Sequence, residues 1–375
     1  MKIIYIVNAR IPTEKAHGYQ ICKMCEEFSS AGAKVELWIP ERANLIKKDA
    51  FLFHGIKPIF IIRRFNSFDF LKYKKFHKVA FFLQSLLFLL KLLNVKIDKD
   101  TLIYTRNPEI AFIFSKRSFN VVYEAHGWPK SKNFLYKFFL KKVFKIIAIT
   151  SIIKKIHERN GIERNKILVA PDGVDLEKFD LKLTRDEARK KLKLPTNKFL
   201  VVYTGHLYKW KGIDTLIESS KILTHEILIY LIGGTESDII KYRKKNINYK
   251  NVHIEGYKEH SEIPYWLKAA DALVLPNSAK EEISKSYTSP LKLFEYMASN
   301  RPIIASDLPS IREILNNKNS ILIEPDNYLK MAEEIKKLIA DNKLARKISE
   351  QAFLDIKNYT WSKRVNNILA FLLNY

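Results

Sequence analysis

The chain has 375 residues, more than one hydrophobic core usually serves, so two domains are expected. Hydrophobic residues make up 47% of the sequence, which excludes a disordered chain and is enough for two packed cores. The formal net charge of +25 suits an anionic partner, although a lysine-rich composition by itself also explains the total.

The first elements indicate a βαβ unit. Lys2–Val7 is typical of a buried strand, Gln20–Ala31 has the spacing of a helix, and Lys34–Ile39 is typical of a second strand. This order predicts a parallel, doubly wound sheet that binds ligands at the carboxyl ends of its strands. Gly18 precedes the expected helix, where backbone N–H groups can meet an anion, although a tight turn also requires a glycine.

Three features of the first half concern location and redox chemistry. Cys22 and Cys25 have C-x-x-C spacing, but no second pair completes a zinc site, so buried thiols in a reducing cytoplasm are favoured. Val79–Leu93 is the most membrane-like segment, yet it is shorter than the ~20 residues of a spanning helix. It is expected to be a buried helix first and an interfacial helix second. Met1–Val7 resembles a strand, so no signal peptide is expected.

Further strands are expected from short apolar runs at Pro58–Ile62, Thr101–Thr105, Val121–Glu124 and Ile146–Thr150. His126 follows the third of these runs, beside Gly127, and so belongs to the ligand-binding edge of the sheet. A loop histidine is as often an ordinary surface residue, and both interpretations stay open on this pattern alone.

The second half repeats the alternation after a turn at Pro171–Asp175 that suits a domain junction. The expected elements are a strand, a helix, a strand and a glycine turn, at Phe199–Thr204, Ile213–Leu223, Ile227–Ile232 and Gly233–Gly234. The loop Gly205–Gly212 follows a strand and precedes a helix, so its backbone can cradle phosphate. Lys211 in this loop would add a positive charge at the start of the helix.

The stretch Ser289–Asp307 carries the most informative carboxylate. Its first part is apolar at helical spacing, Asn300 suits the end of the helix, and a short buried strand follows. Glu295 lies in the middle of this helix, which otherwise looks packed on both sides. A buried carboxylate needs a polar ligand or a counter-charge, whereas periodicity alone favours a glutamate on a solvated face.

Several motifs are missing from the sequence. It contains no G-x-G-x-x-G, Walker or zinc signature, which disfavours dehydrogenases, P-loop enzymes and zinc hydrolases. Asp98–Asp100 has the D-x-D spacing that some transferases use for a divalent metal, but it precedes a strand and is interpreted as solvated turn residues.

The positive charge is unevenly distributed. Through Asp172 the chain has 32 lysines and arginines against 14 acidic residues, so +18 of the +25 lies in the first half. Basic clusters occur at Arg63–Arg64, Lys72–Lys78 and Lys137–Lys145, and the last two interleave with aromatic residues. Such a surface suits an anionic membrane or a polyanion.

Taken together, these motifs resemble the retaining glycosyltransferases of family 4. The resemblance covers essentially the whole chain and depends on the order of its motifs more than on any one of them. They are the loop with Gly18, EAHGW at 124–128, PDGVDLEKF at 171–179, GHLYKWKGID at 205–214, LIGG at 231–234, AADALVLP ending at Pro276, and FEYMASNRPIIAS at 294–306.

The resemblance implies the α/β GT-B architecture, in which two Rossmann-like, doubly wound domains face a cleft. Residues 1–172 would be the acceptor domain, and 173–358 the nucleotide-sugar domain. Residues 359–375 would form a C-terminal helix that packs back on the first domain.

The resemblance also implies the site residues. Glu295 has the place of the second glutamate of the E-x7-E motif, which holds the ribose of the donor, and Tyr287 replaces the first glutamate. Glu281 or Glu282 would then contact the sugar instead. The implied donor-binding residues are Gly18, Gly205, His206, Lys211, Gly233, Leu291, Lys292 and Glu295. The implied catalytic residues are His126, Lys211 and Glu295, with His126 close to the reacting sugar.

The activity implied is transfer of a sugar from a nucleoside-diphosphate sugar to a lipid-linked or cell-surface saccharide. In this family the departing phosphate oxygen is thought to deprotonate the acceptor, so no metal or cofactor is expected. The basic first half favours a peripheral position at the cytoplasmic membrane face and no nucleic-acid partner. The alternatives are a GT-B sugar-nucleotide epimerase and, in another class, a non-catalytic polyanion-binding protein.

Overall fold

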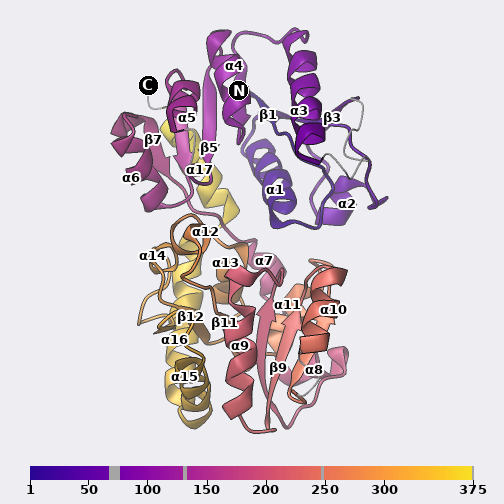
Figure 1. Ribbon diagram of the computed structural model, residues 1–375, viewed down its shortest axis with the longest axis vertical. Coiled ribbons are helices and arrows are strands. Elements are labelled where there is room, and N and C mark those ends of the chain that lie inside the picture. The colour runs from indigo at the N-terminus through magenta and orange to yellow at the C-terminus, as the bar shows by residue number, and fades with distance from the viewer. Residues whose placement is uncertain (67–76, 130–132, 246–248, 374–375) are drawn as a thin grey trace. The chain divides into compact units, whose positions relative to one another are not determined.

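A computed structural model describes residues 1–66, 77–129, 133–245 and 249–373 (Figure 1). It divides into two compact units, each built on one parallel sheet. Unit 1 comprises Met1–Ala170 with Trp361–Tyr375, and unit 2 comprises Pro171–Thr360. Within the basic cluster Lys72–Lys78, residues 72–76 lie outside the described residues.

Unit 1 has a seven-stranded parallel sheet in the order β3-β2-β1-β4-β5-β6-β7. The strands are β1 (Lys2–Ile6), β2 (Lys34–Pro40), β3 (Ile61–Phe65), β4 (Leu102–Thr105), β5 (Val121–Ala125), β6 (Lys145–Ala148) and β7 (Ile167–Val169). Strands β4, β5 and β6 are buried along their whole length, as continuous apolar runs must be when helices cover both faces. The chain reverses direction across the sheet at β1, between β2 and β4, which is where such sheets bind ligands.

The helices of unit 1 are α1 (Ala16–Ser30), α2 (Ala50–His54), α3 (His77–Leu93), α4 (Pro108–Lys116), α5 (Asn133–Leu140), α6 (Ser151–Arg159) and α17 (Trp361–Leu373). The terminal helix α17 packs against α1 (Figure 1). The ring centres of Tyr19 and Trp361 lie 6.4 Å apart at this contact. This confirms the prediction that the C-terminal helix returns to the first domain. Cys22 and Cys25 are buried free thiols of α1, in agreement with core packing.

Two elements of unit 1 begin at least three residues away from the predicted position. Helix α1 begins at Ala16 and not at Gln20, because Lys15 precedes it without any side-chain cap to signal the start. Strand β3 begins at Ile61 and not at Pro58, since pairing with β2 sets its register. That register places the Arg63 guanidinium 5.0 Å from the Trp38 ring centre. Strand β3 lies at the edge of the sheet and carries two exposed arginines, whereas the prediction was based on an apolar run.

Helix α3 also differs from the first interpretation of Val79–Leu93 as a buried helix. Phe88 and Leu92 are buried, but Phe82 is 66% exposed and several leucines are exposed with it. The helix therefore has one buried apolar face and a second apolar face that the described residues do not cover. Among the described parts of the chain, no helix combines the length and apolar character needed to cross a bilayer.

Unit 2 has a six-stranded parallel sheet in the order β10-β9-β8-β11-β12-β13. The strands are β8 (Phe199–Thr204), β9 (Ile227–Ile232), β10 (Val252–Gly256), β11 (Ala272–Leu275), β12 (Ile303–Ser306) and β13 (Ile321–Ile323). The helices are α7 (Leu176–Phe179), α8 (Arg185–Leu192), α9 (Ile213–Ser219), α10 (Glu236–Lys245), α11 (Ile263–Ala269), α12 (Glu282–Ser286), α13 (Leu291–Ala298), α14 (Pro309–Arg312), α15 (Tyr328–Ala340) and α16 (Asn342–Asp355).

Two separate hydrophobic clusters cover the faces of this second sheet. One contains Val202, Ile232 and Leu293 with α11, α13 and α16, and the other contains Val201 and Leu231 with α9 and α15. Strand β8 lies between β9 and β11, so the connections leave it in opposite directions. The loops after β8 and β11 therefore lie on either side of the switch point of the sheet, where doubly wound folds bind ligands.

Candidate functional site

Two glycine turns lie against each other at the carboxyl ends of β8 and β9. Gly205 and Gly233 have φ angles of 117° and 121°, which residues with a side chain rarely adopt. A Cβ atom added to Gly233 would lie 2.4 Å from the carbonyl oxygen of Gly205, so the contact requires glycine. The N–H of Gly205 donates to Ile232 O and that of Gly233 to Gly256 O, so both glycines shape the turn rather than present their own N–H groups.

The loop after β8 is fixed at its other end by Gly212. This residue has a φ of 70° and precedes α9. A Cβ atom here would lie 1.7 Å from the carbonyl oxygen of Pro276, which follows β11. Close approach of two backbones thus holds the segment 205–212 over the ends of β8 and β11. Within it the ring of His206 stacks on Tyr208, with centroids 4.9 Å apart, and His206 O accepts from the Tyr203 hydroxyl.

Two lysines converge on this loop. Lys211 is half-buried, and burial lowers the pKa of its ammonium group to about 7. Lys292 is only 8% exposed, and its Nζ atom lies 3.5 Å from the ring centre of Tyr203. That Nζ atom has no hydrogen-bond partner among the described residues. Burial first, and then the positive charge of Lys211, hold the pKa of Lys292 well below its usual value, while Glu295 opposes this.

Glu295 belongs to the same helix as Lys292. Helix α13 begins at Leu291 after Pro290, so Lys292 lies in its first turn and Glu295 three residues later on the same side. Glu295 is 8% exposed, and its Oε1 atom lies 2.9 Å from Nε2 of His260 in a hydrogen bond. Periodicity alone favoured a solvated face for Glu295, and this interpretation is wrong because other elements pack around α13.

His260 was not predicted from the sequence. It lies in the loop between β10 and α11, 35 residues before Glu295, and no local pattern connects the two positions. The acid proposed for the ribose thus has a neighbouring imidazole that holds one of its oxygens. A search for histidines in loops at the carboxyl ends of strands would have selected His260 together with His126 and His206.

The three residues proposed for the sugar lie around the short helix α12. Tyr287 ends this helix and is half-buried; burial first, and then Glu282, raise the pKa of its hydroxyl. Glu281 precedes the helix and is exposed, and Glu282 is half-buried in its first turn. Within the described parts of the chain, no hydrogen bond joins these residues to Lys292 or Glu295, so their role stays a prediction.

In unit 1, His126 directly follows β5 and contacts a buried carboxylate. Its Nε2 atom lies 2.6 Å from Oε1 of Glu124, which has no exposed surface. Burial first, and then Arg106, lower the pKa of His126 to about 4, against the opposing effect of Glu124. The imidazole is therefore neutral at physiological pH.

Gly18 does not have the predicted position before a helix. It lies in the first turn of α1, and its N–H donates to Lys15 O at 2.9 Å, so this N–H is not available to an anion. A Cβ atom here would lie 2.4 Å from Cγ2 of Thr13. Gly18 therefore permits close packing of the preceding loop on α1. Asp98, one of the two D-x-D aspartates, is exposed and pairs with Lys2 at 3.1 Å.

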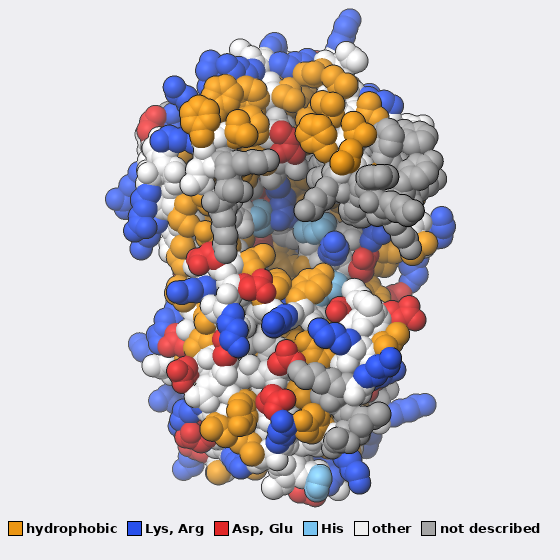
Figure 2. Space-filling model, viewed as in Figure 1, with side chains coloured by type: hydrophobic (Ala, Val, Ile, Leu, Met, Phe, Trp, Pro, Cys, Tyr) orange, Lys and Arg blue, Asp and Glu red, His pale blue; other side chains and the backbone are white. Residues whose placement is uncertain are grey.

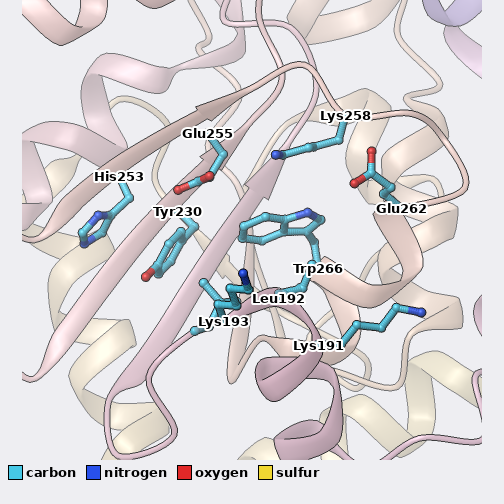
Figure 3. Close-up of a pocket in the computed structure, with 10 residues that line it drawn as sticks. Lys191, Leu192, Lys193, Tyr230, His253, Glu255, Lys258, Glu262 and Trp266 are labelled. Atoms are coloured by element: carbon cyan, nitrogen blue, oxygen red, sulfur yellow. The ribbon is translucent and has the colours of Figure 1, made fainter.

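A cavity of about 400 Å³ lies elsewhere in unit 2, between β9, β10, α8 and α11 (Figure 3). Tyr230 and His253 stack along its side with centroids 4.7 Å apart, and Trp266 forms a neighbouring wall. Lys258 and Glu262 approach from the loop that also contains His260. None of the predicted site residues lines this cavity, so it is separate from the Lys292–Glu295 site.

Comparisons with known proteins agree with this architecture. The family model described as Glycosyltransferase Family 4 matches residues 18–178, and that of Glycosyl transferases group 1 matches residues 184–355. Among solved structures, Anabaena HepE in complex with UDP and glucose superposes over the whole of both chains with a TM-score of 0.79 at 16% identity.

Two curated relatives resemble parts of the chain. An uncharacterized glycosyltransferase of Methanocaldococcus jannaschii is 26% identical over 300 residues, which cover 72% of this chain and 74% of the relative. The putative teichuronic acid biosynthesis glycosyltransferase TuaC of Bacillus subtilis is 26% identical over 217 residues, covering 56% of this chain and 52% of TuaC. The second match thus spans only about half of its relative.

Two α/β units with parallel sheets, together with the likeness to HepE, define a protein of the GT-B fold. With one family model matching most of unit 1 and the other most of unit 2, the chain belongs to the group 1 glycosyltransferases, family 4. The protein is therefore a glycosyltransferase.

Proposed function

We propose that this glycosyltransferase transfers a sugar, with retention of configuration, from a nucleoside-diphosphate sugar to a lipid-linked or cell-surface saccharide. The observation that carries the proposal is the ammonium group of Lys292, which is buried beside Lys211 and forms no hydrogen bond or ion pair with any described residue. A buried cation without a partner is unfavourable in the free protein, and a diphosphate would supply the missing charge.

The surroundings of Lys292 suit a diphosphate leaving group. The first turn of α13 leaves backbone N–H groups without partners inside the helix and gives its N-terminus a partial positive charge. Departure of the diphosphate builds negative charge on its β-phosphate, which two ammonium groups and this helix end would stabilise. We propose that these groups take the place of a metal ion, and that the departing phosphate oxygen accepts the proton of the acceptor hydroxyl.

Glu295 is proposed to hold the ribose of the donor. Its side chain is buried one helical turn from Lys292, so a nucleotide whose diphosphate meets Lys292 would bring its ribose hydroxyls to the carboxylate. One oxygen of Glu295 already bonds to His260, and the other can accept from the ribose. In unit 1, His126 is proposed to contact the reacting sugar, as the corresponding loop histidine does in the family.

The acceptor part of the proposal has two supports. TuaC, one of the relatives, is named as a putative glycosyltransferase of teichuronic acid biosynthesis. The surface of unit 1 also exposes apolar side chains on α3 and on α5 (Figure 2). These side chains are Val79, Phe82, Leu83, Leu86, Leu90 and Leu93 of α3, and Phe134, Leu135 and Phe138 of α5.

Basic side chains lie on the same segment as the exposed apolar side chains of α5. Lys137, Lys141 and Lys142 are exposed on or directly after α5, so exposed phenylalanines and ammonium groups occur on one segment. This combination fits an anionic membrane surface, where apolar side chains enter the interface and lysines meet lipid head groups. We therefore propose that unit 1 binds the membrane that holds the acceptor.

The direct test is a thermal-shift panel of nucleoside diphosphates and of UDP- and GDP-sugars. A ligand that binds only the folded protein stabilises it by mass action, so one diphosphate and its sugars should raise the melting temperature. Glu295→Ala should reduce this shift and the turnover of the selected donor. If no nucleotide shifts the wild-type protein, or if Glu295→Ala and Lys211→Ala retain full activity, the assignment of the site is wrong.

A further inference from the structure

Glu124 is a completely buried carboxylate that accepts hydrogen bonds from four side chains. Its Oε1 atom lies 2.8 Å from Nε2 of Gln20 and 2.6 Å from Nε2 of His126. Its Oε2 atom lies 2.6 Å from the hydroxyl of Tyr104 and 3.2 Å from Nη2 of Arg364. The four donors come from α1, the segment after β5, β4 and α17, and only His126 is partly exposed.

The charge of this carboxylate is fixed by its neighbours. Burial alone would raise the pKa of Glu124, but Arg364, then the hydrogen bond from His126, and then Arg106 hold it well below the ordinary value. Glu124 is therefore ionised, and an ionised carboxylate can only accept. The His126 nitrogen that meets it must carry a proton.

A neutral imidazole has one N–H and one acceptor nitrogen. With the proton of His126 on Nε2 and directed at Glu124, the Nδ1 atom holds the lone pair. Nδ1 has no hydrogen-bond partner among the described residues, and the side chain of His126 is 27% exposed. The group that His126 offers to a ligand is thus an acceptor and not a donor or a cation.

We propose that Glu124 is a positioning residue that holds His126 as the Nε2–H tautomer, so that Nδ1 accepts a hydrogen bond from a hydroxyl of the donor sugar or of the acceptor saccharide. The inference depends on the proposed function, because it deepens the role given to His126 there. No proton is transferred in this step. The acceptor hydroxyl still gives its proton to the departing phosphate, while Nδ1 fixes the orientation of the sugar to which it bonds.

The arrangement around Glu124 predicts what Glu124→Gln would do. Arg364 cannot accept a hydrogen bond, so the amide oxygen would occupy the Oε2 position and the amide NH2 group the Oε1 position. The orientation of Gln20 is fixed by Arg106, which donates to its Oε1 atom at 2.8 Å. His126 is the partner that can adapt, and it would move its proton to Nδ1 to accept from the new amide through Nε2.

The experiment is nitrogen NMR of the full-length protein with ¹⁵N-labelled histidine, with His126 assigned from the spectrum of His126→Asn. The wild type at pH 7 should show a protonated Nε2 and an unprotonated Nδ1 at His126. Glu124→Gln should reverse this pattern and reduce donor turnover by about 100-fold. A wild-type spectrum with the proton on Nδ1 overturns the proposal directly, even if the variant does not fold.

Tyr104→Phe is the matched control, because it removes a hydrogen bond to the other oxygen of Glu124 and leaves His126 untouched. It should keep the wild-type tautomer and turnover. If it loses as much turnover as Glu124→Gln, Glu124 acts by general stabilisation and the positioning role is wrong. If His126→Asn retains wild-type turnover while the tautomers follow the expectation, the fault lies in the proposed function and not in the tautomer assignment.

Two further assays identify the sugar that meets Nδ1. Release of the diphosphate from the donor without any acceptor should fall in Glu124→Gln if Nδ1 bonds to the donor sugar. Transfer alone should fall if it bonds to the acceptor saccharide. Equal rates in both assays for the variant and the wild type would contradict the proposal.

Discussion

The ammonium group of Lys292 lies 3.5 Å from the ring centre of Tyr203 in a buried position close to the like charge of Lys211. The aromatic ring gives partial compensation, since its face attracts cations. The pKa values of both lysines are lowered, so the free protein holds its positive charge at this place only at a cost in stability. Such a cost is common at binding sites, where the ligand supplies the missing partner.

The first prediction concerns this cost. Lys292→Met should leave the melting temperature of the ligand-free protein unchanged or raise it, because an unpaired buried charge is removed. The same variant should lose the thermal shift caused by the nucleoside diphosphate, and turnover of the donor should fall about 100-fold. Differential scanning fluorimetry with and without ligand measures the first two effects.

Lys209→Met is the control for this variant, since Lys209 lies in the same loop but is exposed. It should retain both the thermal shift and the turnover. A variant Lys292→Met with an undiminished nucleotide-induced shift would show that the diphosphate binds elsewhere.

The second prediction follows from Lys211, whose pKa burial lowers to about 7 from 10.5. Between these values the unfolded chain binds more protons at Lys211 than the folded protein, so this residue makes the free energy of unfolding rise with pH. A bound diphosphate favours the charged ammonium, so binding takes up a proton and the affinity should fall as the pH rises from 7 to 9. The limit for one group is about tenfold per pH unit.

Isothermal titration calorimetry in two buffers with different ionisation enthalpies counts the protons taken up. Lys211→Arg keeps the positive charge but does not titrate in this range, so proton uptake should decrease by the share of Lys211. Lys292, whose pKa is also lowered, can account for the proton uptake that remains in Lys211→Arg. Equal proton uptake by wild type and Lys211→Arg would contradict this prediction.

The fold was largely predictable from the sequence because both sheets are buried. Strands β8 and β9 have the predicted bounds, because each is a continuous apolar run, which is typical of a parallel strand buried on both faces. The edge strand β3 was misplaced because an exposed edge carries charged residues, so hydrophobicity does not mark it. The start of α1 was misplaced because no capping residue marks it.

The site was predictable where one segment holds the relevant residues. Glu295 and Lys211 were noted from their own segments, whereas Lys292 was named only through the resemblance to the family; Lys292 and Glu295 share helix α13, and Lys211 shares a loop with two glycines. The partners of Glu124 were not predictable, since Arg364 is 240 residues away and meets it only because α17 returns to unit 1. The same is true of His260 and Glu295, which only tertiary folding brings together.

The third prediction tests the backbone contact that fixes the loop 205–212. Gly212→Ala combines a positive φ with a Cβ atom 1.7 Å from Pro276 O, so the loop must move. We expect a loss of about 3 kcal/mol or more in the free energy of unfolding. Gly32→Ala is the control, because Gly32 also has a positive φ of 90° but no atom within 4 Å of the added Cβ.

Gly32→Ala should therefore lower the free energy of unfolding only through the strain of its positive φ angle, by about 1–2 kcal/mol. The difference between the two variants in chemical denaturation measures the steric effect at Pro276. Equal losses would mean that the backbone of Pro276 yields freely and does not fix the loop.

The last prediction concerns the apolar surface of α5. Phe134 is 79% exposed and Phe138 is 46% exposed, and an interfacial helix would insert both rings into the bilayer. Each of Phe134→Ser and Phe138→Ser should weaken binding to vesicles that contain anionic phosphatidylglycerol by about tenfold, in proportion to the apolar area that is no longer buried. Vesicle sedimentation at several salt concentrations measures this, and added salt should weaken wild-type binding because Lys137 of α5 and Lys141 and Lys142 directly after it contribute. Leu329→Ser and Leu354→Ser provide matched controls, since both residues are more than half exposed but belong to unit 2. If these controls weaken binding as much as the α5 variants, or if all variants bind like the wild type, α5 is not the membrane-binding surface.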